Sequence, residues 1–245
     1  MRVLLTRAAN ASARSASVLK GVGHQALVMP LVRVVDLGKP VPPGHFDATA
    51  FTSAAAVEII TQRISANRQL AQITALPAFC VGAATAEAAR MAGFSQVHTG
   101  TGNAANLVEL LAASQPANTT RPKLLHVAPR HRAFDLAAAL PHWHVMQMLA
   151  YEAQLVDPGR AAFRAALDQC EAALLYSSRS AAHLWDLARR HECTARFECL
   201  TLIAISEQTA QAIASQAKLP VHIAATPDEA AMIRLLDKKQ AGLEA

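Results

Sequence analysis

The sequence predicts an α/β protein that contains two similar parallel-sheet domains. Short apolar segments typical of strands alternate with segments of helical spacing along the 245 residues. In addition, residues 46–57 resemble residues 171–184, because each segment has an apolar strand, an aromatic residue, two hydroxyl residues and the start of a helix. Thr52 aligns with Ser177 in this match, at an offset of 125 (177 − 52). A repeat of this length indicates a duplicated domain rather than a solenoid unit.

Further matches support the duplication. Residues 81–86 resemble residues 205–210, and residues 97–98 resemble residues 221–222, both at an offset of 124 (205 − 81 and 221 − 97). Weaker resemblances relate residues 3–5 to 124–126 and residues 24–31 to 142–149. Each copy therefore has a leading strand-helix-strand part and a trailing set of further elements.

The positions of the copies predict how the chain is divided. If the long segments at equivalent points of the repeat pair with each other, the chain crosses between the domains twice. The first domain then contains both termini, residues 1–30 and 157–245. Residues 31–46 and 142–156 form the linker strands, and residues 47–141 form the second domain.

The individual elements follow from apolar spacing and from glycine and proline. The expected strands are residues 3–5, 26–29, 31–35, 49–51, 78–81, 96–98, 123–127 and 144–156. The expected helices are residues 12–20, 54–64, 85–92, 104–113 and 134–140, and the alternation continues over residues 160–236. Gly21 and Gly23 end the helix 12–20, and Gly93 ends the helix 85–92, because glycine accepts a left-handed cap. Pro30 ends a strand, and residues 38–44 are rich in glycine and proline, as in a linker.

The composition excludes several classes of function. The net charge is +5, but basic residues are dispersed and aromatic residues make up only 4%, which is not typical of a nucleic-acid binder. No apolar run is long enough to span a membrane or to act as a signal peptide, so we expect a cytoplasmic protein with no membrane partner. The cysteines (Cys80, Cys170, Cys193, Cys199) lack C-x-x-C spacing, and no spacing of ligand residues indicates a metal site. A mildly positive protein suits a small anionic ligand.

Hydroxyl residues recur where strands are expected to lead into helices. These residues are Ser53, Thr85, Ser177, Ser178, Ser206 and Thr209. Such junctions lie at the carboxyl edge of a parallel sheet, where ligands of these folds bind, and helix N-termini favour anions. The alternative is that the residues are ordinary N-caps, for which serine and threonine are preferred. The segment Gly100-Thr-Gly-Asn103 lacks the third glycine of a dinucleotide-binding motif.

Taken in order, a set of short motifs resembles the uroporphyrinogen-III synthase family. The motifs are Val3-Leu-Leu-Thr-Arg7, Phe51-Thr-Ser53, Val81-Gly-x-x-Thr85-Ala, Gly102-Asn103-Ala, Tyr151-Glu, Tyr176-Ser-Ser178 and Ile205-Ser-x-x-Thr209-Ala. The resemblance implies two flavodoxin-like α/β domains joined by a two-stranded β-ladder. It also implies a cyclizing hydro-lyase of heme and porphyrin biosynthesis, which dehydrates and closes the linear tetrapyrrole hydroxymethylbilane with inversion of the last pyrrole ring. The resemblance further implies that the protein is a monomer, uses no cofactor and makes a transient contact with the preceding pathway enzyme.

The resemblance also assigns roles to residues. Tyr151 is the candidate general acid, and its alternative role is to pack on the linker strand. The implied substrate-binding residues are Arg7, Thr52, Ser53, Thr85, Asn103, Ser177, Ser178, Ser206 and Thr209. The chain departs from the family at Ala128-Pro129-Arg130, where a glycine is usual. Two other classes stay open: a periplasmic-type binding protein, which would need a signal peptide, and a non-catalytic relative that binds a tetrapyrrole or a small anion.

Overall fold

The computed structural model describes residues 1–114, 121–131, 134–217 and 219–242. The chain divides into two compact units. Unit 1 comprises Met1–Arg33 and Gln154–Ala245, and unit 2 comprises Val34–Ala153. Within the described ranges, no helix is long and apolar enough to cross a membrane.

Unit 1 is built on a parallel sheet. Its strands are β1 (Arg2–Leu5), β2 (Gln25–Val28), β9 (Ala172–Leu175), β10 (Thr201–Ala204) and β11 (Val221–Ile223), in the order β11-β10-β9-β1-β2. All neighbouring strands in this sheet run parallel. Numbered along the unit, this is the flavodoxin-like order 2-1-3-4-5. The prediction of a parallel-sheet α/β fold is confirmed.

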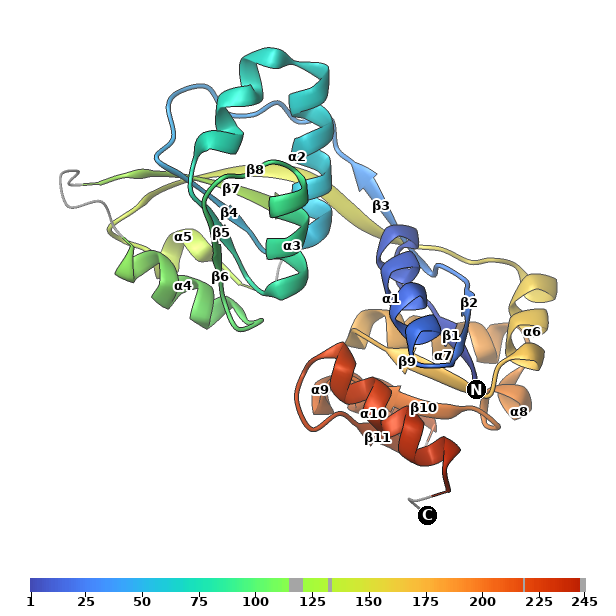
Figure 1. The fold of residues 1–245 in the computed structure, drawn as a ribbon. Coiled ribbons are helices and arrows are strands. Elements are labelled where there is room, and N and C mark those ends of the chain that lie inside the picture. Colours follow the sequence, from blue (N-terminus) through green and yellow to red (C-terminus); the bar gives the residue numbers. More distant parts are fainter. Residues whose placement is uncertain (115–120, 132–133, 218, 243–245) are drawn as a thin grey trace. The chain divides into compact units, whose positions relative to one another are not determined.

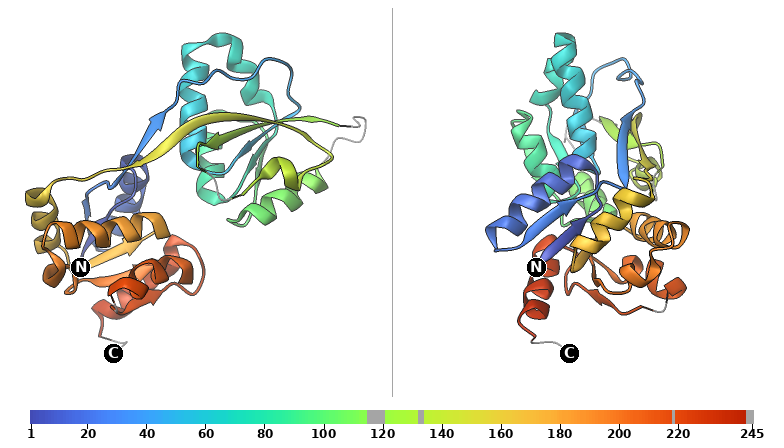
Figure 2. Two further views of the ribbon diagram at one scale, coloured as in Figure 1. Left: turned by 180° about the vertical axis from the view of Figure 1, so that it is seen from behind. Right: turned by 90° about the vertical axis from the view of Figure 1, so that its right-hand side faces the viewer.

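Helices cover both faces of the unit 1 sheet (Figures 1 and 2). They are α1 (Ala9–Gly21), α6 (Arg160–Gln169), α7 (Ser178–Arg190), α8 (Thr194–Phe197), α9 (Glu207–Ala217) and α10 (Glu229–Gln240). In β1, Val3 and Leu5 pack with α1 and α10, whereas Leu4 packs with α6 to α9. This alternation follows from the two-residue period of a strand, and burial on both faces requires an apolar residue at every one of these positions.

Unit 2 contains a second, larger sheet. Its strands are β3 (Val32–Asp36), β4 (Ala48–Phe51), β5 (Ala78–Cys80), β6 (Val97–Thr99), β7 (Lys123–Pro129) and β8 (His144–Leu155), in the order β3-β8-β7-β4-β5-β6. Strands β4 to β8 pair in parallel. The edge strand β3 is antiparallel to β8, because Leu37 N donates to Ala150 O while Val156 N donates to Leu31 O.

Two groups of helices cover the faces of the unit 2 sheet (Figure 1). They are α2 (Ala54–Ala66), the 3₁₀ helix η1 (Arg68–Ala75), α3 (Ala83–Met91), α4 (Ala104–Ala113) and α5 (Leu136–Ala139). The first three pack on the face that carries Phe51, and α4 and α5 pack on the face that carries Phe79. Helix α5 is shorter than the predicted segment 134–140 at both ends. It begins after its N-cap, Asp135, and it ends before Leu140, whose φ is −123°, because Pro141 disfavours helical geometry there.

The strand order supports the predicted duplication. If unit 2 is read from β7, its order β8-β7-β4-β5-β6 is the same 2-1-3-4-5 arrangement as β2-β1-β9-β10-β11 in unit 1. The N-cap residues of α2 and α7 are Ser53 and Ser177, so the structure pairs them at an offset of 124 (177 − 53). All three strong matches therefore share one offset, and Thr52 corresponds to Tyr176 rather than to Ser177.

The segments predicted as linker strands both contribute to the unit 2 sheet. Residues 31–46 contain β3, and residues 142–156 contain β8, which pairs with β7 from Lys123↔His144 to Pro129↔Tyr151. A separate two-stranded linker between the domains stays a prediction.

Candidate active site

In each unit, the candidate residues cluster at the carboxyl ends of the parallel strands. In the flavodoxin-like order, the topological switch point lies between β1 and β9 in unit 1 and between β7 and β4 in unit 2. Arg7 follows β1 and Tyr176 follows β9, whereas Ser53 follows β4 and Tyr151 lies opposite Pro129 of β7. The sheet topology therefore brings these residues to the edges where ligands of such folds bind.

The Arg7 side chain is held in a polar cluster of unit 1. Its guanidinium carbon lies 4.1 Å from the centre of the Tyr176 ring, and its Nη1 donates to Ser15 Oγ at 3.1 Å. The same nitrogen lies 3.6 Å from Glu229 Oε1 at the first turn of α10. Both Ser15 Oγ and the Tyr176 hydroxyl donate to that carboxylate oxygen. Arg7 is therefore fixed by a stacked ring and an ion pair, with a third of its side chain exposed (33%).

Tyr176 keeps its proton in this cluster. Burial raises the pKa of its phenol, and the nearby Glu229 carboxylate raises it further by charge and by the hydrogen bond that it accepts. Hydrogen bonding to Ser15 and the charge of Arg7 lower the pKa by less. The hydroxyl is therefore a permanent donor at neutral pH.

Of the other candidates of unit 1, Ser177 and Ser206 cap helices, whereas Ser178 is the first residue of α7 and Thr209 is buried within α9. Ser177 accepts from Ser180 N at 3.2 Å, and Ser206 accepts from Thr209 N at 3.3 Å. Ser178 begins α7, and its Oγ donates to Gln208 O at 3.0 Å. Capping is thus observed, but it also anchors two helix N-termini at the carboxyl edge of the sheet.

Tyr151 and Ser53 form the central pair of unit 2. Their hydroxyl oxygens lie 2.6 Å apart, and Ser53 Oγ also accepts from Ala56 N at the start of α2. Tyr151 is 6% exposed, and burial raises the pKa of its phenol, while the hydrogen bond with Ser53 lowers it by less. The tyrosine hydroxyl is therefore protonated at neutral pH and lies beside a helix N-terminus.

The remaining candidates of unit 2 have different surroundings. Asn103 is the N-cap of α4 and accepts from Asn106 N at 2.8 Å. Thr85 does not cap a helix: Gly82 holds that position, and Thr85 lies inside α3 at 5% exposure. Thr52 lines a cavity of about 270 Å³ at the carboxyl edge.

The basic loop after β7 lies at the same edge. Arg130 Nη1 lies 3.5 Å from Glu152 Oε2, and His131 Nε2 lies 3.2 Å from Glu152 Oε1. Arg132, the third basic residue of this loop, is outside the described residues. The loop that follows Pro129 therefore contacts Glu152, the residue next to Tyr151.

Sequence reasoning did not find Ser15 or Glu229. These residues are 214 positions apart, and neither belongs to a motif. Tyr176 belongs to the motif Tyr176-Ser-Ser178. Its position between a buried strand and a helix cap was the available signal.

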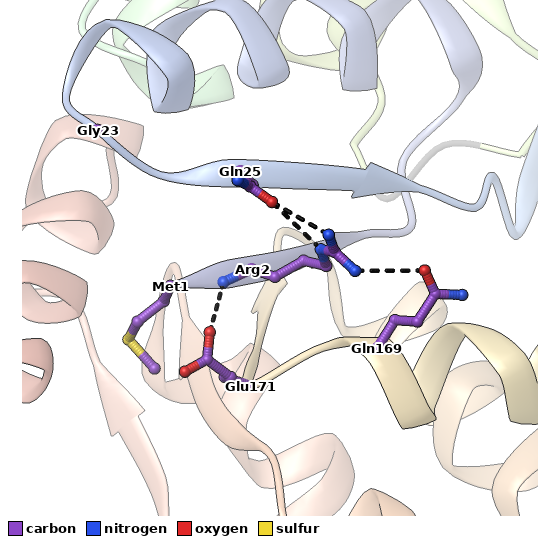
Figure 3. A pocket seen from close by; sticks show the side chains of 6 residues that line it. All are labelled: Met1, Arg2, Gly23, Gln25, Gln169 and Glu171. Atoms are coloured by element: carbon purple, nitrogen blue, oxygen red, sulfur yellow. Dashed lines mark hydrogen bonds between the residues drawn. The ribbon is translucent and has the colours of Figure 1, made fainter.

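A second hollow, of about 380 Å³, lies at the opposite, amino edge of the unit 1 sheet (Figure 3). Its lining residues are Met1, Arg2, Gly23, Gln25, Gln169 and Glu171. The Arg2 guanidinium donates to the amide oxygens of Gln25 and Gln169, which hold it across the strand ends. Because ligands of this fold bind at the carboxyl edge, this hollow is not the candidate site.

In the described part of the chain, no group of three or more histidine, cysteine or acidic residues could hold a metal ion. The candidate residues in this part of the chain offer hydroxyl groups, the Arg7 guanidinium, the Asn103 amide and helix N-termini.

Comparison with known proteins assigns these features to one family. The family model described as uroporphyrinogen-III synthase HemD matches residues 13–234. The fold is similar to uroporphyrinogen-III synthetase from Helicobacter pylori, with a TM-score of 0.65 and 18% identity over 97% of this chain and 98% of that chain. It is also similar to a mutant uroporphyrinogen III synthase from Thermus thermophilus, with a TM-score of 0.56 and 18% identity over 99% of both chains. No curated protein gives a significant match.

Proposed function

Because this chain belongs to the uroporphyrinogen-III synthase family, whose members are lyases of heme biosynthesis, we propose that it converts hydroxymethylbilane into uroporphyrinogen III. The observation that carries the proposal is the pair Tyr151–Ser53, a neutral hydroxyl donor placed at the carboxyl edge beside a helix N-terminus.

The substrate requires a receptor for carboxylates. A linear tetrapyrrole with acetate and propionate arms carries eight of them, and each helix N-terminus favours an anion by about 0.3–1 kcal/mol. Helices α2, α4 and α7 begin at the carboxyl edges with Ser53, Asn103 and Ser177 as caps. We assign these N-termini to the substrate arms.

Arg7 supplies the strongest single contact for a carboxylate. A guanidinium group binds a carboxylate in a planar fork, and a charge-assisted hydrogen bond contributes about 1.5–3 kcal/mol. Tyr176 and Glu229 hold the guanidinium in place, so less side-chain entropy is lost on binding.

Tyr151 supplies the proton for the departing hydroxyl group. When the carbon–oxygen bond of the hydroxymethyl group breaks, the leaving group takes the phenol proton and departs as water. The last pyrrole ring then forms a carbon–carbon bond through its substituted carbon, which carries no hydrogen. The bond from that carbon to its original methylene bridge breaks and re-forms at the unsubstituted carbon of the same ring, whose proton is released and replaces the one that the phenol lost. The initial attack is thus made by the substituted carbon. The main task of the protein is to hold the chain so that this carbon, rather than the unsubstituted one, reacts.

The remaining assignments belong to the same proposal. We place the protein in the cytoplasm, because the four cysteines are free thiols, as expected in a reducing compartment. We expect a monomer that uses no cofactor, and a transient contact with the enzyme that supplies its unstable substrate.

The decisive experiment is an isomer assay. Purified protein is incubated with hydroxymethylbilane, and the products are oxidised and separated by chromatography. Type III product above the spontaneous background supports the proposal. Spontaneous type I product alone, at any protein concentration, would show that the chain is a non-catalytic relative.

A further inference from the structure

The cavity at the carboxyl edge of unit 2 has apolar walls and a polar mouth. Its lining residues are Thr52, Val81, Ala104, Leu107, His126, Pro129, His131, Phe134 and Leu136, and its volume is about 270 Å³. Leu107 and Leu136 are fully or almost fully buried, whereas Phe134 is 39% exposed at the edge. A hollow lined by aliphatic and aromatic side chains with a few polar groups has the lining of a small-molecule site.

The equivalent place in unit 1 is filled by protein side chains. The shared offset pairs Thr52 with Tyr176, and the position after the N-cap pairs Ala104 of α4 with Glu229 of α10. In unit 1, Tyr176 and Glu229 meet there in the cluster that holds Arg7. In unit 2, the smaller threonine and alanine line the cavity instead. The duplicated fold thus has one filled and one open switch point.

The mouth of the cavity lies at the N-terminus of α4, which favours anions. Asn103 caps α4, and Thr101 N donates to Asn106 Oδ1 at 2.8 Å, which fixes the preceding loop. A Cβ atom at Gly100 would lie 2.9 Å from Val81 O, so only glycine permits this close approach of the loop to β5. On the other side, Arg130 and His131 both contact Glu152, so the Arg130 guanidinium offsets the charge of this carboxylate at the rim.

We propose that this cavity binds one pyrrole ring of the linear tetrapyrrole, with an acetate or propionate arm at the N-terminus of α4. This inference rests on the proposed function and identifies the part of the substrate that unit 2 receives. An apolar ring fits the apolar walls, and the anionic arm fits the helix N-terminus. The volume is slightly below the usual range of about 300–1,000 Å³ for drug-sized ligands, so the cavity holds one ring and not four.

The cavity lies close to the candidate proton donor, Tyr151. Thr52 lines the cavity, and the next residue, Ser53, contacts the Tyr151 hydroxyl. A ring held there would therefore lie across the end of β4 from the proton donor. At the β1–β9 switch point of unit 1, the described residues instead offer the Arg7 guanidinium.

The test uses a monopyrrole that carries one acetate and one propionate arm, titrated into the 245-residue protein and followed by NMR. We expect saturable binding that shifts the resonances of Thr52, Ala104 and Phe134. Ala104→Leu puts a larger side chain at the cavity wall and should weaken binding roughly tenfold or more, the usual effect of a misfit of one or a few methylenes in an apolar pocket. Ala105→Leu, an exposed neighbour on the same helix, is the matched control and should bind as the parent does.

Two further measurements test the ring site. Phe134→Ala removes an exposed ring. It should weaken binding of the monopyrrole without lowering the melting temperature of the protein. Sodium acetate, which has the charge but no ring, should not displace the monopyrrole at equal concentration. Displacement by acetate, or equal affinity in Ala104→Leu and Ala105→Leu, would overturn the assignment. The isomer assay on the parent protein is independent: type III product with no effect of Ala104→Leu on binding would refute the ring site and leave the proposed function intact.

Discussion

The hydroxyl of Tyr151 and the Oγ of Ser53 lie 2.6 Å apart, although the two residues are 98 positions apart in the chain. Strand β8 brings the tyrosine alongside β7, and β4 brings the serine to the start of α2. The hydrogen bond therefore links the proton donor of the proposed reaction to the end of a neighbouring helix, whose dipole favours the anionic arms of the substrate.

Tyr151→Phe is expected to remove the chemical step and preserve the fold. The ring stays the same size, so the loss of stability should be about 0.5–1.5 kcal/mol, the contribution of one hydrogen bond. The rate of type III formation should fall by about 10²–10⁴-fold, as for a positioned general acid. Unprocessed substrate then closes spontaneously, and the product shifts toward type I. Ser53→Ala, which removes the cap of α2 and the hydrogen bond to the phenol but leaves the phenol itself, should lower the rate by less than Tyr151→Phe does. Type III formation at the parent rate in Tyr151→Phe would reduce the tyrosine to a packing residue.

The raised pKa values of the two tyrosines predict that the protein loses stability in alkaline solution. Burial raises the pKa of both Tyr151 and Tyr176 above the ordinary value of 10.0. Between that value and the folded pKa, the unfolded chain has lost the proton and the native protein keeps it. The stabilisation is thus complete below about pH 10 and is lost as the pH rises through the folded pKa. Urea unfolding at several pH values measures the slope of the free energy of unfolding against pH.

Replacement of each tyrosine provides the control for this pH dependence. These are the only tyrosines in the sequence, so Tyr151→Phe and Tyr176→Phe separate their contributions from that of lysine. The slope should decrease more in Tyr176→Phe, because the Glu229 carboxylate adds to the effect of burial there. Identical slopes in the parent and both variants would contradict the burial of the phenols.

Ser177→Asp distinguishes capping from substrate binding. Aspartate caps a helix as well as serine does, so the melting temperature should change little. The added negative charge at the N-terminus of α7 should repel a substrate carboxylate and raise KM. Asn67→Asp is the matched control, because Asn67 caps η1, before the amino end of β5, by accepting from Gln69 N at 3.0 Å. Equal KM values in the two variants would assign Ser177 to capping alone.

Arg7→Lys should show that geometry, and not only charge, binds the substrate. Lysine keeps the positive charge but loses the planar fork and the stacking on Tyr176. We expect KM to rise by roughly tenfold, equivalent to about 1.4 kcal/mol, with a smaller change in kcat. Lys20→Ala, which removes a charge from an exposed position of α1, should leave KM nearly unchanged. A larger effect of Lys20→Ala than of Arg7→Lys would indicate that only the net charge matters.

Salt provides a separate test of the electrostatic contribution. The substrate is a polyanion and the protein carries a net charge of +5, so its affinity should fall as ionic strength rises. The decrease should be smaller in Arg7→Ala than in the parent, because one of the screened contacts is gone. An affinity that does not depend on salt would point to an apolar ligand.

The sequence by itself determined the class of fold and the repeat. Strands buried on both faces need unbroken apolar runs, and helices need a 3.6-residue spacing, so both patterns are local and readable. The predicted helix 104–113 is α4, Ala104–Ala113, with the same bounds. The matches at offsets near 124 predicted two copies, and the strand order 2-1-3-4-5 occurs in both.

The tertiary structure alone decided which hydroxyl caps a helix and which residues share the site. Ser177 and Ser178 are adjacent and chemically identical, but only Ser177 has the extended backbone, φ −157° and ψ 146°, that aims its oxygen at Ser180 N. The cluster of Arg7, Tyr176 and Glu229 depends on strand β9 lying beside β1 and on the placement of α10, which no local pattern encodes. The same holds for the cavity beside Thr52, because a hollow is left by side chains from several distant elements and exists only once they pack.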